Sequence, residues 1–409
     1  MGLVVQKFGG TSVGDTDRIK NVAQKVKSEI DAGNRVVVVV SAMAGVTNQL
    51  VRYCQEISPD YSPQEYDVVV STGEQVTIGL LAMALQAIGV PARSWTGWQV
   101  PVLTDSAASK ARINKIDVEG LNECLARGMV PVVAGFQGID GDGRITTLGR
   151  GGSDTSAVAL AAVLHADRCD IYTDVDGVYT TDPRFVKNAR KLDRVTYEEM
   201  LEMASLGAKV LQTRSVELAM KYRVNLRVVS SFEKNPVGTT ICDEGDIVEK
   251  EIISGITCSR DEAKITLVGV QDKPGVSAAV FNAMAEANIC IDMIVQSDSP
   301  DGTHTDMTFT LPESDLNRAL AVLEKDKADI GYRNVISDSD CAKISLVGVG
   351  MRTHTGIARK MFEALSAKGI NVQTISTSEI KISVLIAAEY AELAVRALHN
   401  AFHLENKEK

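Results

Sequence analysis

The chain has 409 residues, 45% of them hydrophobic and 23% charged, which is typical of soluble globular proteins. This length predicts two to three domains. The formal net charge of −10 argues against non-specific binding to nucleic acids or to anionic membranes. The aliphatic run Val36–Val40 is far too short to span a bilayer.

The cysteines and histidines show no metal-binding or disulfide pattern. Seven cysteines are dispersed without a C-x-x-C pair, which indicates free thiols in a reducing compartment. Five scattered histidines make a structural zinc site unexpected. Residues 1–7 lack the basic and apolar regions of a signal peptide, so we expect a cytoplasmic protein.

The first 230 residues alternate strand-like and helix-like patterns. In chain order, we expect a strand at 3–6, a helix at 17–30, a strand at 35–41, helices at 48–57 and 73–88, a strand at 130–136, a helix at 157–165 and a strand at 168–173. Strand–helix–strand order with buried strands predicts a layered α/β sheet. Ligands of such sheets bind beyond the carboxyl ends of the strands.

The C-terminal part contains an internal repeat. Ala263–Val270 and Ala342–Val349 open two copies that read strand, glycine-containing loop, helix and strand. Two copies are too few for a solenoid. The acidic stretch Cys242–Lys250 before them is typical of a surface linker.

A glycine-rich turn follows the first strand. Lys7–Gly14 combines one lysine, three glycines and two hydroxyl side chains. Backbone amides of such a loop can surround a phosphate, and the lysine adds a point charge. Lys7 precedes the glycines, so the segment is not a Walker A motif, and a simple tight turn is the alternative.

A second glycine-rich turn, Thr146–Ser156, leads into the alanine-rich helix. Ser153, Asp154 or Thr155 can cap that helix, but capping does not account for Arg150 between glycines. A guanidinium there can hold a carboxylate or a phosphate through paired hydrogen bonds. The two turns together indicate one anionic ligand contacted at both ends.

A third segment, Tyr172–Arg184, is dense in turn residues. It lacks the closing glutamate of a calcium loop. A nucleotide-contacting loop fits better: Tyr179 faces the base, Thr173 and Asp174 make polar base or ribose contacts, and Arg184 reaches phosphate.

Several motifs in this order resemble those of the aspartate kinases, over essentially the whole chain. They are Val5–Val13, Ser41–Thr47, Ser71–Glu74, Gly149–Asp154, Thr173–Tyr179 with Asp182–Arg184, and Gly207–Leu211. The C-terminal repeats resemble tandem ACT domains.

The resemblance implies an amino acid kinase-type α/β/α layered sheet followed by two ferredoxin-like ACT α+β domains. We expect a catalytic domain at 1–245, a linker at 246–262 with a strand packing on the second ACT unit, and ACT domains at 263–341 and 342–409. The implied reaction moves the ATP γ-phosphoryl group to the side-chain carboxylate of L-aspartate. It yields 4-phospho-L-aspartate and ADP, the first step toward lysine, threonine, methionine and diaminopimelate.

The resemblance also implies residue roles. Lys7 would bridge the nucleophile and the transferred phosphate, and Asp154 would orient Lys7 or a metal-bound water. The expected ATP-binding residues are Lys7, Phe8, Gly9, Gly10, Thr173, Asp174, Tyr179, Arg184 and Lys209. The expected aspartate-binding residues are Ser41, Thr47, Glu74, Arg150 and Ser153. Glu74 paired with the helix dipole, and Lys209 as a solvated helix charge, are the alternatives from the residues alone.

The chemistry of the implied reaction agrees with these residues. A carboxylate nucleophile is ionised near neutral pH, so no general base is needed. Phosphoryl transfer then depends on positioning and on charge neutralisation. Mg²⁺ would arrive on the nucleotide with few protein ligands, so no protein metal site is expected.

For the ACT domains we expect effector binding and assembly into a dimer or tetramer. The expected effector-site residues are Asp272, Gly275, Ser277, Gln296, Ile357, Ala358, Asn371, Val372, Ser378 and Glu379. Lysine, threonine or both would inhibit by binding an inactive conformation more tightly. A dimerisation module without an effector is the alternative.

The sequence leaves three other functions as alternatives. The first is a related kinase for glutamate, N-acetylglutamate or UMP, against which Glu74, Arg150 and the ACT domains speak. The second is a non-catalytic amino acid sensor, which intact Lys7, Arg150, Asp174 and Lys209 disfavour. The third, an NAD-dependent enzyme, lacks a G-x-G-x-x-G turn followed by an acidic residue about 20 positions on.

Overall fold

The computed structural model describes residues 2–207, 210–234, 236–246, 252–298 and 303–406. These residues form two compact units. Unit 1 comprises 1–178, 191–205 and 209–249, and unit 2 comprises 179–190, 206–208 and 250–409. The expected domain at 1–245 is therefore not one continuous body, because residues 179–190 group with the C-terminal unit.

Unit 1 is built on an eight-stranded sheet with the order β10-β12-β11-β9-β1-β2-β6-β3. Its strands are β1 Leu3–Phe8, β2 Arg35–Val40, β3 Ala92–Trp95, β6 Val130–Ala134, β9 Arg168–Thr173, β10 Arg194–Thr196, β11 Leu226–Ser230 and β12 Thr239–Cys242. β11 and β12 run antiparallel, and the other pairs in this sheet run parallel. The run Val36–Val40 in β2 is wholly buried, because a central strand of a parallel sheet is covered on both faces.

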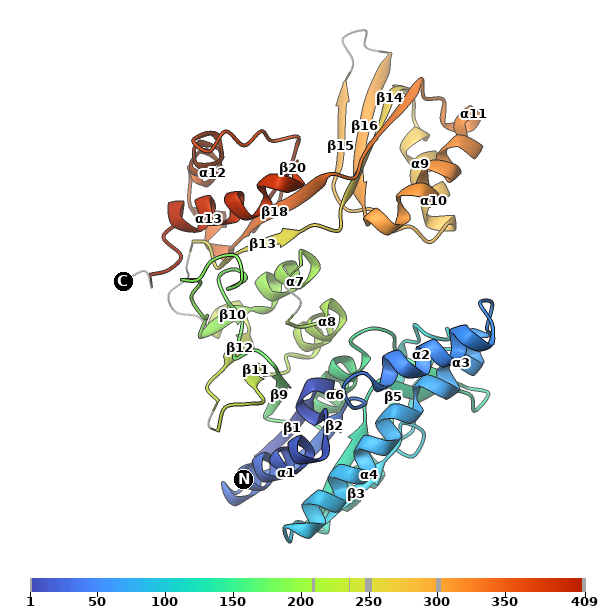
Figure 1. The fold of residues 1–409 in the computed structure, drawn as a ribbon, viewed down its shortest axis with the longest axis vertical. Helices are drawn as coiled ribbons and strands as arrows, with labels where there is room; N and C mark the ends of the chain where they lie inside the picture. Colours follow the sequence, from blue (N-terminus) through green and yellow to red (C-terminus); the bar gives the residue numbers. More distant parts are fainter. Residues whose placement is uncertain (1, 208–209, 235, 247–251, 299–302, 407–409) are drawn as a thin grey trace. The chain divides into compact units, whose positions relative to one another are not determined.

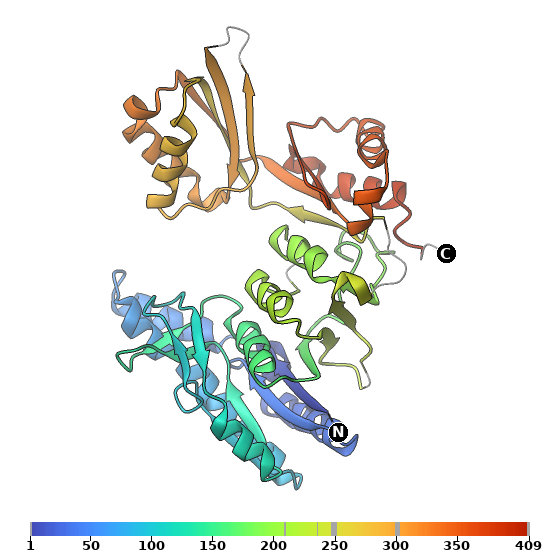
Figure 2. The same cartoon turned by 180° about the vertical axis from the view of Figure 1, so that it is seen from behind.

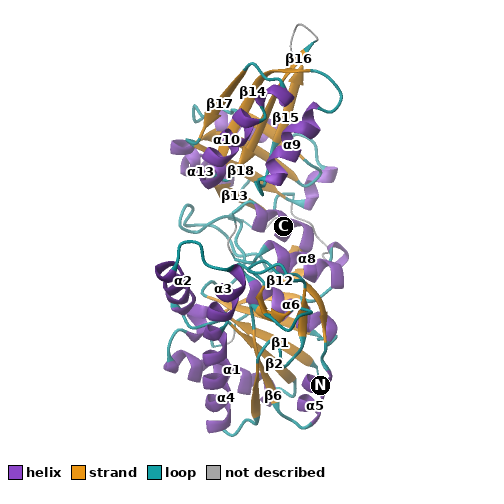
Figure 3. Cartoon of the chain, turned by 90° about the vertical axis from the view of Figure 1, so that its right-hand side faces the viewer, coloured by secondary structure: helices purple, strands orange, loops and turns teal. Residues whose placement is uncertain are grey.

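Helices cover both faces of this sheet. The helices of unit 1 are α1 Thr16–Asp31, α2 Val46–Ile57, α3 Pro63–Val70, α4 Thr72–Ala87, α5 Glu119–Ala126, α6 Gly152–Val163, α7 Tyr197–Ser205 and α8 Thr213–Tyr222. Figure 3 shows β1, β2 and β6 between α1 and α4 on one side and α5 and α6 on the other. The α1–α4 side forms a continuous apolar core with Phe8, Val38 and Leu81. The predicted layered α/β fold is confirmed.

Helix ends follow local sequence signals. Asp15 caps α1, since its carboxylate accepts a hydrogen bond from the Arg18 N–H at 2.8 Å. α6 begins at Gly152, five residues before the predicted start, because Gly151 takes the left-handed conformation (φ 71°) at the N-cap. The stretch Pro63–Ala87, broken at Ser71, has the length and apolarity of a membrane span. Half of its most apolar 18-residue segment is buried inside the fold.

A smaller four-stranded sheet, with the order β5-β4-β7-β8, extends unit 1. Its strands are β4 Val102–Thr104, β5 Ile113–Ile116, β7 Gln137–Ile139 and β8 Ile145–Thr147. β7 and β8 form an antiparallel hairpin, with Gln137 opposite Thr147. This hairpin leads directly into the loop that carries Arg150.

Unit 2 contains two four-stranded sheets, one for each sequence repeat (Figures 1 and 2). The first repeat comprises β14 Ala263–Gln271, α9 Val276–Glu286, β15 Ile294–Asp298, β16 His304–Leu311, α10 Leu316–Lys325, α11 Lys327–Ile330 and β17 Asn334–Asp338. The second comprises β18 Cys341–Val347, α12 Ile357–Ser366, β19 Thr374–Thr377, β20 Lys381–Ala387 and α13 Ala391–Ala401. In each repeat the helices pack on one face of an antiparallel sheet, as predicted.

Two segments from earlier in the chain complete the second repeat. β13, Gly255–Ser259, pairs antiparallel with β18, so the edge strand comes from the residues before the first repeat. Residues 179–190 join the same body. Val186 lies in its apolar core, and the Thr180 hydroxyl is 3.1 Å from Nε2 of the buried His399.

A buried lysine joins the two repeats. Lys343 on β18 is 4% exposed, and its ammonium forms ion pairs with Glu262, at 2.6 Å, and with Asp292. Glu262 precedes β14, and Asp292 precedes β15. The two carboxylates hold the pKa of Lys343 above its usual value although burial opposes this.

Candidate active site

The carboxyl ends of four neighbouring strands meet at one edge of the large sheet. β1 is flanked by β2 and β9, with Phe8 opposite Val40 and Tyr172, and β6 lies next to β2. The segments that leave these ends include the Lys7–Gly10 turn, the Ser41–Ala42 loop and the Thr173–Asp174 loop. This is the edge at which open α/β sheets bind ligands.

Lys7 and Asp154 form an ion pair at this edge. Lys7 Nζ lies 2.6 Å from Asp154 Oδ1, and each residue is 8% exposed. Lys7 comes from the end of β1 and Asp154 from the first turn of α6. The two catalytic candidates expected from the sequence are thus in direct contact. Gly9 lies beside the ammonium, because a Cβ there would come within 3.3 Å of Lys7 Nζ.

Glu74 lies close to the same edge, on the first turn of α4. Its Oε1 accepts a 2.9 Å hydrogen bond from the Ala42 N–H, and the Ser41 N–H bonds to the Phe8 carbonyl. Among the described residues Glu74 Oε2 has no hydrogen-bond partner, although it is buried. Burial raises the pKa of Glu74 to about 7, against the opposing effect of the Ala42 N–H. A ligand cation at Oε2 would stabilise the ionised form.

The other predicted aspartate-binding residues lie at the starts of helices. Ser153 is in the first turn of α6, and Arg150 is an exposed residue of the preceding loop. Thr47 is in the first turn of α2, after Gly45. Ser153 and Thr47 therefore lie at helix N-termini, which favour anionic groups.

The predicted nucleotide residues divide into three groups. Thr173 and Asp174 leave the end of β9, where the Thr173 hydroxyl donates to Asp174 Oδ1 at 3.1 Å. Tyr179 and Arg184 belong to the segment that groups with unit 2, and the Arg184 guanidinium pairs with Asp182 at 2.6 Å. Lys209 lies outside the described residues.

Phe8 has a different environment from that of a nucleotide contact. Its side chain is 0% exposed and stacks on Tyr172 with ring centroids 4.4 Å apart. Any contact of Phe8 with a ligand is thus restricted to its backbone. The stacked pair instead supports the turn at Gly9, whose N–H bonds to the Tyr172 carbonyl at 3.3 Å.

Ser231 was missed in the sequence. Its hydroxyl hydrogen-bonds to Ser12, and its N–H bonds to the Thr173 carbonyl at 2.8 Å. Because β11 runs parallel to β9, Ser230 and Ser231 end at the same edge as Thr173. In the sequence, the two valines of β11 followed by Ser230 and Ser231 are the pattern that indicates polar side chains at the end of this strand.

The predicted effector residues are divided between the two repeats, and those at the helix starts occupy equivalent places. Gly275 (φ 97°) precedes α9, and Gly356 (φ 86°) precedes α12, so each helix follows a left-handed glycine. The predicted residues at or beside these helix starts are Asp272, Gly275, Ser277, Ile357 and Ala358. Gln296 lies on β15, Asn371 and Val372 precede β19, and Ser378 and Glu379 lie in the turn between β19 and β20.

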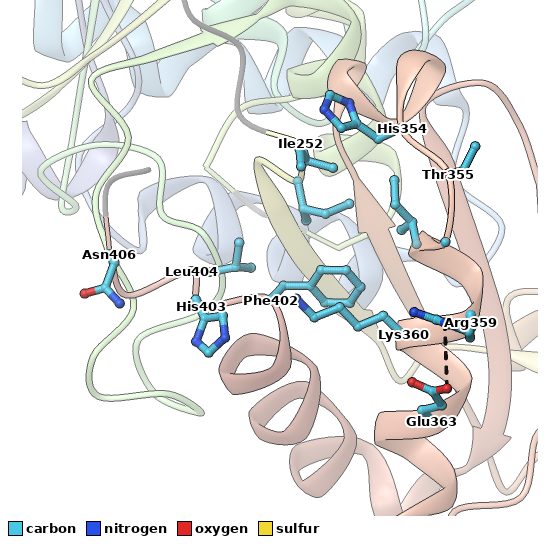
Figure 4. Close-up of a pocket in the computed structure, with 13 residues that line it drawn as sticks. Ile252, His354, Thr355, Arg359, Lys360, Glu363, Phe402, His403, Leu404 and Asn406 are labelled. Atoms are coloured by element: carbon cyan, nitrogen blue, oxygen red, sulfur yellow. Dashed lines mark ion pairs between the residues drawn. The ribbon is translucent and has the colours of Figure 1, made fainter. Parts of the chain in front are cut away.

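A cavity of about 460 Å³ lies in the second repeat, between the start of α12 and the chain after α13 (Figure 4). Of the predicted effector residues, Ile357 lines it. Lys360 lies over the Phe402 ring, with Nζ 5.0 Å from its centroid, and Arg359 pairs with Glu363 at 3.8 Å. All the residues that line this cavity belong to unit 2.

The carboxylates of the described residues do not gather into a metal site. In the part of the chain that the structure describes, no group of three or more His, Cys, Asp or Glu side chains is placed to hold an ion. Asp154, paired with Lys7, and Asp174 offer isolated carboxylates. A Mg²⁺ ion at this edge would take most of its oxygen ligands from phosphates and water.

Comparison with known proteins agrees with this architecture. Residues 2–230 match the amino acid kinase family, and residues 265–326 and 344–402 each match an ACT domain. The chain is 60% identical over 407 residues to an aspartokinase of Pseudomonas aeruginosa, covering 99% of this chain and 98% of that protein. It is 58% identical over 405 residues to an aspartate kinase of Stutzerimonas stutzeri, with the same coverage.

Solved structures show the same relationship. Escherichia coli aspartokinase III in complex with aspartate and ADP (R-state) is 29% identical, with a TM-score of 0.83 over 98% of this chain and 99% of that one. The same enzyme in complex with lysine and aspartate (T-state) gives a TM-score of 0.77. The fold and the site thus define a member of the amino acid kinase family. Within it, the chain belongs to the aspartate kinases that carry tandem ACT domains.

Proposed function

We propose that this chain transfers the γ-phosphoryl group of ATP to the side-chain carboxylate of L-aspartate, giving 4-phospho-L-aspartate and ADP. The observation that carries the proposal is the Lys7–Asp154 ion pair at the carboxyl edge of the sheet, next to the Gly9–Gly10 turn. A buried ammonium there neutralises charge on the carboxylate and on the transferred phosphate. Asp154 holds the ammonium in place.

Aspartate presents one ammonium and two carboxylates. Glu74 is the partner for the ammonium, since its buried Oε2 has no hydrogen-bond partner among the described residues. Arg150 is the partner for a carboxylate through paired hydrogen bonds. Ser41, Thr47 and Ser153 add hydroxyl donors. A carboxylate nucleophile needs no general base, so the site requires positioning and positive charge.

ATP occupies the Gly9–Gly10 and Thr173–Asp174 side of the edge. Mg²⁺ would be held mainly by the nucleotide phosphates, and Asp154 or Asp174 would reach it directly or through water. When bound, the ion screens phosphate charge. The chain's own residues supply orientation and the Lys7 charge.

A hydroxamate assay tests the reaction. Hydroxylamine traps an acyl phosphate, so it reports the product directly with ATP, magnesium and L-aspartate. We expect signal with aspartate but not with glutamate or N-acetylglutamate, and loss of signal in Lys7→Ala. ATP binding without product from any amino acid would instead support a non-catalytic sensor.

We further propose that lysine, threonine or both inhibit the enzyme through the ACT repeats, and that the reaction opens cytoplasmic synthesis of lysine, threonine, methionine and diaminopimelate. The support is the pair of left-handed glycines that precede α9 and α12 at equivalent positions. Activity titrated with each end product is the test. Unchanged activity with all of them would leave the repeats as assembly modules of a dimer or tetramer.

A further inference from the structure

Asp67 on α3 is a buried carboxylate that the reaction does not use directly. It is 0% exposed, and among the described residues it forms no ion pair. Its charge is balanced by four donors. Oδ2 accepts the N–H groups of Ser109 and Thr147, both at 2.9 Å. Oδ1 accepts the hydroxyls of Thr147, at 2.7 Å, and Ser109, at 3.2 Å.

Both donor residues, Ser109 and Thr147, lie next to the loop that carries Arg150. Thr147 ends β8, three positions before Arg150. Ser109 lies against the other side of the loop, since a Cβ on Gly149 would come within 3.0 Å of the Ser109 carbonyl oxygen. The Ala111 N–H bonds to the Thr147 carbonyl at 3.0 Å and ties the two segments together.

Ser109 is held in an unfavourable backbone conformation. Its φ is 65°, in the left-handed region that non-glycine residues seldom adopt. Such a residue persists when surrounding interactions fix it, and Asp67 binds both its N–H and its hydroxyl. The Asp67 carboxylate accepts all four of its hydrogen bonds from Ser109 and Thr147. It therefore anchors both residues beside the Arg150 loop.

The far side of the loop is fixed from α8. Arg214 donates to the carbonyls of Leu148, at 2.9 Å, and Ala111, at 2.8 Å. Gln212 packs on Gly151 so closely that a Cβ there would come within 1.8 Å of Gln212 Cγ. Arg150 therefore projects from a loop whose flanking residues are held on both sides.

We propose that Asp67 is a positioning residue for the aspartate site: by anchoring Ser109 and Thr147, it holds Arg150 ready to receive a substrate carboxylate. This rests on the proposed role of Arg150. Preorganisation of this kind lowers the cost of binding, because the loop need not be ordered when the substrate arrives. Asp67 itself touches neither substrate.

The first test is Asp67→Asn in the full chain. An amide keeps the shape but turns an N–H₂ group toward two donors. We expect the KM for aspartate to rise about tenfold while the KM for ATP stays within about twofold. The matched control is Asp140→Asn, the same change at the other end of the β7–β8 hairpin, where Asp140 accepts the N–H groups of Asp142 and Arg144. The control should leave both constants unchanged.

A second pair covers the case in which Asp67→Asn does not fold. Thr147→Val removes one donor without changing shape and should raise the KM for aspartate, and Thr147→Ser, which retains the hydroxyl, should restore it. An unchanged aspartate KM in folded Thr147→Val or Asp67→Asn overturns the inference. So does an equal rise in both KM values that tracks a lower melting temperature.

Amide hydrogen exchange separates this inference from the proposed reaction. In the ligand-free chain, Asp67→Asn should speed exchange at residues 109–111 and 147–151, whatever the enzyme phosphorylates. Wild-type protein that gives no hydroxamate with aspartate would refute the proposed function. Active wild type whose loop exchange and aspartate KM are unaffected by the substitution would refute the anchoring role alone.

Discussion

The ammonium of Lys7 and the carboxylate of Asp154 lie 2.6 Å apart and join the end of β1 to the first turn of α6. Each side chain is almost completely shielded from water, so the pair is weakly screened. Removing either partner leaves the other charge uncompensated. The lysine and the aspartate therefore have separable roles, one in charge neutralisation and one in orientation.

Asp154→Asn should lower kcat by roughly 10- to 100-fold while leaving nucleotide affinity nearly unchanged, because Lys7 keeps its charge but loses its fixed position. Steady-state kinetics and equilibrium ATP binding measure the two quantities. Lys7→Ala serves as the comparison, with a much greater loss. Wild-type kcat in Asp154→Asn would show that Lys7 is positioned by other groups.

Because of Glu74, we expect the kcat/KM for aspartate to fall on the acid side of its pH profile. With its pKa raised to about 7 by burial, the carboxyl of the free enzyme is neutral below that pH and cannot pair with the substrate ammonium. The value of kcat/KM for aspartate should fall about tenfold per pH unit below 7. The side chain of aspartate itself ionises near pH 4 and does not contribute in this range.

Glu74→Gln is the control for this limb. It should raise the KM for aspartate at pH 8 and give a flat profile between pH 5.5 and 8. An acid limb that persists in Glu74→Gln would assign the titration to another group.

The same raised pKa affects the stability of the ligand-free protein. Between pH 4.5 and about 7 the folded state keeps the Glu74 proton that the unfolded state releases, so the unfolding free energy falls as pH rises through this window. Glu74→Gln removes this loss and should stabilise the protein at pH 8, by at most about 3 kcal/mol. Denaturant unfolding of both proteins at pH 5 and pH 8 measures it; equal differences at both pH values would contradict the assignment.

Gly151→Ala should reduce both stability and activity. The residue has φ 71°, and a Cβ would overlap Gln212. A left-handed backbone costs about 1–2 kcal/mol and overpacking about 1–3 kcal/mol, so a loss of roughly 2–5 kcal/mol is expected in thermal or denaturant unfolding. Gly141→Ala, where a Cβ meets nothing within 4 Å, is the matched control and should be near neutral.

Lys343→Met should destabilise unit 2 by about 3 kcal/mol, because it leaves Glu262 and Asp292 together without a cation. Adding Glu262→Leu should recover much of the loss, since the buried negative charge is then removed. Unfolding of the single and double variants measures the coupling. Additive losses in the double variant would show that the lysine and the glutamate are energetically independent.

Features that depend on a short stretch of residues could be predicted from the sequence. The glycine turn after β1, the β-branched run of β2 and the repeated strand–loop–helix pattern predicted the sheet, the Lys7 edge and the two repeats. Helix starts were less accurate: α6 begins earlier than its apolar pattern because Gly151 and Gly152 carry no hydrophobic signal.

Interactions between distant segments were not predictable in the same way. Nothing in the residues near Asp67 indicates that Ser109 and Thr147 would converge on it from 42 and 80 positions away. Burial of Phe8 depends on its stacking with Tyr172 in another strand. The Glu262–Lys343–Asp292 cluster likewise exists only once the two repeats have folded against each other.

The packing of residues 179–190 into the second repeat means that the two halves of the protein are not interchangeable cassettes. A polypeptide cut near residue 245 retains Val186 but loses the core that shields it, and one that begins near residue 252 retains that core but leaves a vacancy in it. A cut at the linker therefore divides the apolar core of the second repeat between the two fragments.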